Sequence, residues 1–106
     1  MTTFGVLPAD VVLARTTGQF DVRTVPSGLL RAHQVAAGVW GCLVVHAAPV
    51  TFVFEDDPDA PLHLAAGDRV VIPPERPHHV ELGAEGRFSV EFHRKPAGRP
   101  TIPDAD

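Results

Sequence analysis

Residues Gly67 to Leu82 read GDRVVIPPERPHHVEL, and this stretch decides the fold. A glycine and an aspartate form a turn that leads into a short apolar strand at 69–72, and a proline-rich corner ends that strand. Pro77 has a fixed φ and no N–H, so the corner is rigid and the next strand begins at His78. The corner holds the His78 imidazole in one direction at low entropic cost, which suits a metal ligand.

Alternation along the strand at 78–82 separates two faces. His78 and Val80 share a face with Leu82, whereas His79 and Glu81 lie on the opposite face. The first set is mostly apolar, so we predict that it points into the interior and that His79 meets solvent.

The composition indicates one all-β domain. The chain has 106 residues, enough for one two-sheet core but not for a second independent core. Eleven prolines and nine glycines separate short runs rich in Val, Leu, Ile and Phe, and no segment shows an apolar stripe at helical spacing. We expect residues 1–94 to form the domain and the Pro- and Gly-rich residues 95–106 to form a loose tail. The predicted strands are 11–13, 20–25, 29–35, 39–48, 50–55, 62–64, 69–72, 78–82 and 87–93.

Charge and hydropathy exclude several classes of partner. Nine basic and thirteen acidic residues give a formal charge of −4 with neither sign in a run, so we expect no nucleic-acid partner. No stretch approaches the roughly 18 apolar residues of a membrane span, and no glycine-rich phosphate loop follows a strand, so we expect neither a membrane nor a nucleotide partner. Cys42 is the only cysteine and is interpreted as a core residue, which fits a reducing, cytoplasmic location.

Two histidines are the main candidates for a site. His33 lies in the predicted strand 29–35 and His78 at the rigid corner. Neutral imidazole binds Zn, Ni, Fe or Mn, so one divalent transition metal is one hypothesis, although no third protein ligand is visible. The alternative is a buried pair that hydrogen-bonds internally or to water. Arg31 shares a face with His33, where its guanidinium could bind an anionic ligand, or it lies exposed at the mouth of the fold.

Three further residues are candidates for the pocket. Trp40 is the only tryptophan, and it belongs either to the core or to a wall of a small-molecule cavity. Glu91 and His93 share one face of the strand at 87–93. They could supply additional donor atoms for a metal, or they could form a polar face that points outward.

The stretch from Gly67 to His78 resembles the second motif of the cupin superfamily. That motif has a glycine, five residues, a proline, one residue, a glycine, two residues and a histidine that usually ligates a metal. In this chain Glu75 replaces the second glycine, and Leu82 stands where the motif has asparagine. The first motif, which usually has a pair of histidines, keeps His33 only, since Val35 occupies the second position.

Over residues 8–94 the chain is similar to the cupin-like domain at the N-terminus of tellurite-resistance methyltransferases, which also occurs as a stand-alone small protein. The resemblance rests on LLRAH at 29–33, GVWG at 38–41, LVV at 43–45, TF at 51–52, IPP at 72–74, PH at 77–78, EL at 81–82 and VEF at 90–92. It implies a jelly-roll barrel, the double-stranded β-helix of cupins, with His33 and His78 at the two typical family histidines. The 106 residues do not include a methyltransferase half, so we expect no methyl-transfer chemistry from this domain.

Three functions follow from these patterns. The first is a module that binds a small molecule or anion in a His33/His78 pocket, with or without a metal, linked to resistance to tellurite or a related oxyanion. The second is a metal-dependent enzyme of the dioxygenase or isomerase type, in which the metal activates O₂ or polarises a carbonyl. The third is a metal-free barrel for dimerisation or regulation. Cupin-like barrels often dimerise through an edge strand, so we also expect a homodimer.

Overall fold

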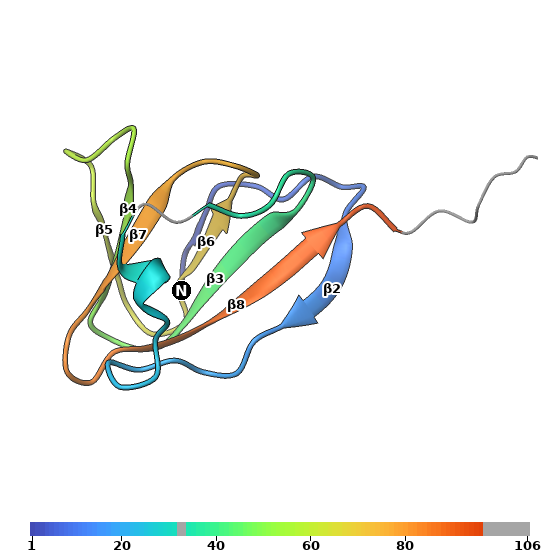
Figure 1. The fold of residues 1–106 in the computed structure, drawn as a ribbon. Helices are drawn as coiled ribbons and strands as arrows, with labels where there is room; N and C mark the ends of the chain where they lie inside the picture. Colours follow the sequence, from blue (N-terminus) through green and yellow to red (C-terminus); the bar gives the residue numbers. More distant parts are fainter. Residues whose placement is uncertain (32–33, 97–106) are drawn as a thin grey trace, which may run out of the picture.

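The computed structural model describes residues 1–31 and 34–96, which form two β-sheets (Figure 1). The larger sheet has the strand order β1-β6-β3-β8-β2 and the smaller one β5-β4-β7. All neighbouring strands are antiparallel except β1 and β6, which are parallel. The elements are β1 (Thr3–Phe4), β2 (Val12–Thr16), the 3₁₀ turn η1 (Ser27–Leu30), β3 (Trp40–Ala47), β4 (Val50–Phe54), β5 (Leu62–Leu64), β6 (Arg69–Ile72), β7 (His78–Leu82) and β8 (Arg87–Arg94).

The all-β prediction is confirmed, but the closed barrel is not. Among the residues that the structure describes, no hydrogen-bonded strand pair joins the two sheets, so they form an open two-sheet arrangement. Local alternation predicts strands and their faces, whereas closure depends on pairing between segments far apart in the chain. Within the same described residues, no helix is long and apolar enough to cross a membrane.

Two predicted strands are wrong over the residues that are described. In the segment 20–25 only Phe20 pairs, through an isolated bridge to Phe88. The Asp21 side chain accepts hydrogen bonds from the backbone N–H groups of Arg23 and Thr24, which closes a local turn in place of a strand.

The other wrong prediction is the strand at 29–35. The described part of this segment begins with the last residues of η1, where the N–H of Leu29 donates to the carbonyl of Pro26. The sequence Pro26-Ser27-Gly28 favours a turn, and in the structure this turn continues to Leu30 as η1. His33 lies outside the described residues, as does most of the predicted tail at 95–106.

The core lies between the two sheets. Phe52 of β4 and Phe88 of β8 are fully buried there and are its largest side chains. The other buried residues of this core cluster come from both sheets and from the segment before β3, namely Val35, Leu43, Val45, Val50, Leu64, Val70, Ile72, Val80 and Val90. The inward side predicted for the strand at 78–82 is confirmed, since His78 and Val80 are both buried.

Two residues with positive φ shape the stretch from Gly67 to His78. Gly67 has a φ of 92°, in the region that favours glycine. The Asp68 carboxylate accepts the backbone N–H groups of Ala65 and Thr2, which holds the pKa of that carboxyl below its usual range. Glu75, at the position of the second motif glycine, adopts a φ of 62° and donates its N–H to the carbonyl of Val35. The corner before His78 therefore turns as a glycine would allow.

We predict that Gly86→Ala destabilises the fold, by about 1–3 kcal/mol, because it overpacks the turn between β7 and β8. A Cβ at this position would lie 2.3 Å from the backbone oxygen of Pro49 and 3.0 Å from Leu82. At Gly18 an added Cβ has nothing within 4 Å, so Gly18→Ala is the matched control. Urea unfolding of both variants measures the difference, and equal midpoints would contradict this packing.

Candidate functional site

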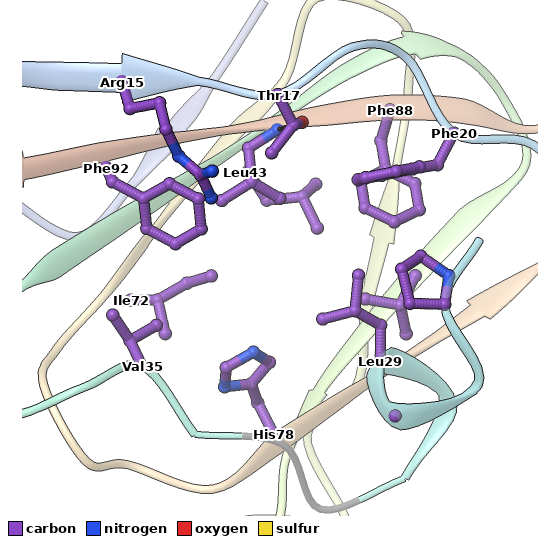
Figure 2. Close-up of a pocket in the computed structure, with 14 residues that line it drawn as sticks. Arg15, Thr17, Phe20, Leu29, Val35, Leu43, Ile72, His78, Phe88 and Phe92 are labelled. Atoms are coloured by element: carbon purple, nitrogen blue, oxygen red, sulfur yellow. Dashed lines mark hydrogen bonds between the residues drawn. The ribbon is translucent and has the colours of Figure 1, made fainter. Parts of the chain in front are cut away.

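A cavity of about 220 Å³ lies between the two sheets, and its lining is mostly apolar (Figure 2). The apolar lining residues are Phe20, Pro26, Leu29, Val35, Leu43, Ile72, Val80, Phe88, Val90 and Phe92. The remaining lining residues are Gly28 and the polar residues Arg15, Thr17 and His78. The volume is below the roughly 300–1,000 Å³ of sites for drug-sized molecules, so a ligand held inside would be smaller.

His78 lies in the cavity wall at the first residue of β7, as the sequence predicted. It is 2% exposed, and its ring stacks on Phe52 with 5.1 Å between ring centroids. The ring Nδ1 lies 3.0 Å from the backbone oxygen of Arg76. Because a carbonyl can only accept, Nδ1 carries the proton, and in the neutral ring the lone pair is on Nε2. The corner, the stacking and this hydrogen bond fix both the direction and the tautomer of the imidazole.

Arg15 lines the mouth of the cavity from the edge strand β2. Figure 2 shows its guanidinium directed into the hollow space, with the His78 ring on the opposite side. The guanidinium carbon lies 5.0 Å from the centroid of the Phe92 ring, which places the cation over an aromatic face. In the described part of the chain, no carboxylate pairs with Arg15.

A β-bulge explains why Arg15 faces inward. In the pairing of β2 with β8, Leu13 lies opposite His93, but the register then shifts so that Arg15 lies opposite Phe92. An unbroken register would have placed Arg15 opposite Glu91, on the outer face of the sheet and beside a carboxylate. The bulge therefore turns this cation away from an ion pair and toward the cavity.

Thr17 also lines the cavity, but its hydroxyl is occupied. The oxygen accepts the N–H of Val90 at 3.0 Å, and the hydroxyl donates to the carbonyl of Gly18 at 2.8 Å. Thr17 thus ties the end of β2 to β8. Arg15 is the polar lining residue whose charge no described carboxylate neutralises.

Sequence reasoning did not single out Arg15. The predicted strand ended at residue 13, and no motif marks the bulge that follows it. The one local signal was the run of β-branched threonines after Arg15, which favours continuing the strand through residues 16 and 17.

The other residues nominated from the sequence lie elsewhere. Arg31 is exposed and does not line the cavity. Trp40 borders a separate hollow, which also contacts Phe4 and Pro73. Glu91 and His93 alternate with cavity residues of β8 and so face the outer side of the larger sheet.

On that outer face Glu91 is the centre of a small ionic network. Its Oε1 lies 2.6 Å from Nη2 of Arg69 and 3.0 Å from Nε2 of His93. Cys42, which pairs opposite Glu91, is buried, and burial raises the pKa of its thiol. The network explains the polar residues at this end of β8 and matches the prediction of an outward polar face.

The described residues do not by themselves make a metal centre. Over residues 1–31 and 34–96, no group of three or more His, Cys, Asp or Glu side chains could hold a metal ion. His78 is the one residue of these types that lines the cavity in that part of the chain. A metal site would need His33, whose side chain lies outside the described residues, and so metal ligation stays a prediction.

His79 faces away from the cavity, as expected from alternation, and is bonded on both ring nitrogens. Nδ1 lies 2.5 Å from Oε2 of Glu55 and Nε2 lies 3.0 Å from Oε2 of Glu81. Each carboxylate accepts a hydrogen bond from the imidazolium, so Glu55 first and Glu81 second raise the pKa of His79 above its ordinary value of 6.5.

We predict that His79 makes the fold less stable as the pH rises. Because the folded-state pKa is above the unfolded value, the contribution of the imidazolium is fully present below about pH 6.5 and is lost as the pH passes the folded-state pKa. Urea unfolding between about pH 6 and pH 8 should show this decline in the wild type and a flatter profile in His79→Gln. Parallel profiles for the two proteins would show that the two ion pairs do not stabilise the fold.

Comparisons with known proteins agree with this fold. A family model described as "TehB-like domain" matches residues 15–90. The crystal structure of a protein from E. coli strain K12 has a TM-score of 0.79 and 25% identity, and the match covers 88% of this chain and 99% of that one. TehB from Haemophilus influenzae has a TM-score of 0.73 and 18% identity, with 82% of this chain and 32% of that protein covered. The chain thus spans about a third of that TehB. No match was found among curated protein sequences.

Proposed function

The chain belongs to the TehB-like domain family, which is related to tellurite resistance, and we propose that it is a small-molecule-binding module. The ligand is a small molecule with an apolar body, which fills the cavity between the sheets, and one anionic group, which binds Arg15. The observation that carries this proposal is the guanidinium of Arg15, turned by the bulge into an apolar cavity and paired with no described carboxylate.

The chemistry of the lining supports this ligand class. Apolar walls such as Leu43, Val80 and Val90 favour a hydrocarbon surface, at about 25 cal/mol for each Å² removed from water. A guanidinium beside a low-dielectric cavity favours a carboxylate or another oxyanion group, which it can bind bidentately. His78 lines the side of the cavity opposite Arg15.

Calorimetric titration with matched probes tests the proposal. Hexanoate carries both an apolar chain and a charge, hexan-1-ol keeps the chain without the charge, and tellurite is an oxyanion without a chain. We expect hexanoate to bind most tightly, because only it uses both the apolar walls and Arg15. Tellurite has no apolar chain to contact the cavity walls, so it should bind more weakly than hexanoate. The proposal fails if neither hexanoate nor hexan-1-ol binds.

A metal-loaded pocket is the second candidate. It is supported by the hydrogen bond from Nδ1 of His78 to a backbone carbonyl, the second contact that metal-ligating histidines commonly make. When bound, a divalent metal would supply a second positive charge for the anionic group of the ligand. The dioxygenase or isomerase hypothesis depends on the same metal.

Elemental analysis of untagged protein distinguishes the two candidates. After expression with added Zn, Ni, Fe or Mn, a metal-loaded pocket requires stoichiometric metal in the wild type that is lost in His33→Ala and in His78→Ala. Wild-type protein without stoichiometric metal would remove this candidate and leave Arg15 as the source of positive charge.

A homodimer remains a separate proposal, supported by the exposed edge of the larger sheet. β2 stands at one end of the strand order, and all five of its residues are exposed. An edge of this kind presents backbone groups that can pair with a second copy. Sedimentation velocity over a range of concentrations would show a dimer, and a monomer throughout would exclude it.

A further inference from the structure

A second hollow adjoins the cavity, and the two share part of their lining. This second hollow has a volume of about 380 Å³, and its lining includes Arg15, Val35 and Phe92, which also line the cavity. Its other lining residues are Ala14, Ala36, Val39 and Arg94. The two hollows are therefore neighbouring compartments, separated at Arg15 and the Phe92 ring that it covers.

Two arginines, Arg15 and Arg94, line the second hollow. Arg94 is two residues beyond Phe92 on β8, so alternation places both on the same face of the sheet, and Arg15 reaches that face through the bulge. Over residues 1–31 and 34–96, neither guanidinium forms an ion pair with a carboxylate. Two like charges that line one hollow repel each other until an anion lies between them.

We propose, on the basis of the binding function proposed above, that this hollow is the subsite for an anionic headgroup with three terminal oxygens. The ligand is then a phosphate or sulfate monoester of a small apolar group. The apolar group occupies the cavity beside His78, and the headgroup lies between Arg15 and Arg94.

The charge and the number of oxygens of the headgroup favour a monoester over a carboxylate in this hollow. A carboxylate has two oxygens, which one guanidinium satisfies bidentately. A phosphate monoester has three terminal oxygens and between one and two negative charges at neutral pH, so it can accept hydrogen bonds from two guanidiniums at once. The chain has a formal charge of −4, so a pair of arginines without partners is a local exception to its overall charge.

Titrations of hexyl phosphate, hexyl sulfate, hexanoate and hexan-1-ol test the proposal on the wild type and on Arg94→Gln. We expect hexyl phosphate to bind the wild type about tenfold more tightly than hexanoate, because it has a second guanidinium to contact. The Arg94→Gln variant should lose that preference and keep its affinity for hexanoate and hexan-1-ol. The exposed Arg23, which lines neither compartment, provides the control Arg23→Gln.

The two probe types separate this inference from the proposed function. If hexanoate binds but hexyl phosphate binds no more tightly, or if Arg94→Gln leaves the preference intact, the headgroup subsite is wrong and the binding module stands. If neither hexanoate nor hexan-1-ol binds, the binding module itself fails. Hexyl sulfate, with a single charge, shows whether charge or the number of oxygens sets the preference.

Discussion

Arg15→Gln is expected to weaken hexanoate binding by about tenfold or more, because a charge-assisted hydrogen bond contributes about 1.5–3 kcal/mol. Solvent at the mouth of the cavity screens the guanidinium, so we expect the lower end of that range. The affinity for hexan-1-ol should change little, since the alcohol carries no charge. Calorimetry on the folded variant measures both affinities.

The control variant removes the same positive charge at a position away from the cavity. Arg23→Gln removes one positive charge from an exposed turn and should bind hexanoate like the wild type. Added salt should weaken hexanoate binding in the wild type and leave hexan-1-ol binding unchanged. If Arg15→Gln and Arg23→Gln lower the hexanoate affinity equally, the effect is one of net charge and Arg15 has no specific role.

Phe52→Ala is expected to lower the free energy of unfolding by about 3–5 kcal/mol, because it removes a fully buried ring from between the sheets. Phe52 contacts the Phe54 ring edge-on at a centroid distance of 4.9 Å and supports the stacked ring of His78. The loss therefore affects both the core and the wall of the cavity. Urea unfolding followed by circular dichroism measures the change.

A milder variant keeps this prediction testable if Phe52→Ala does not fold. Phe52→Leu retains most of the apolar volume and should cost about 1–2 kcal/mol. Val6, which is 84% exposed, provides the surface control, and Val6→Ala should stay within about 0.5 kcal/mol of the wild type. A Phe52→Leu protein as stable as Val6→Ala would show that Phe52 does not carry the core.

Much of the fold could be predicted because its strands alternate locally. The runs at 69–72 and 78–82 match β6 and β7, and the inward direction of His78 followed from its apolar neighbours on one face. The strand β1 was missed because it has two residues and depends on its parallel pairing with β6. The open arrangement of the sheets was missed for the same reason, since it depends on contacts between distant segments.

The site was harder to predict than the fold because its polar residues reach the cavity through irregular backbone. Arg15 faces inward only because one residue of β2 is bulged, and single-residue irregularities leave no pattern in composition or period. Arg31 was nominated on the assumption of a strand from residue 29, but it directly follows the 3₁₀ turn η1, which ends at Leu30. Glu91 was nominated because it shares a face of β8 with His93. Whether that face points inward or outward depends on how β8 pairs with β3, which the sequence does not reveal.

Methyl-selective NMR tests the central claim, that the cavity between the sheets binds a small anionic amphiphile. In protein labelled at the Leu and Val methyl groups, added hexanoate should shift the signals of Leu29, Leu43, Val80 and Val90, which line the cavity. The exposed Val6 and Leu13, which do not line it, should be unaffected. Saturating hexanoate that shifts the exposed methyl groups, or none, while the cavity signals stay in place would contradict the claim.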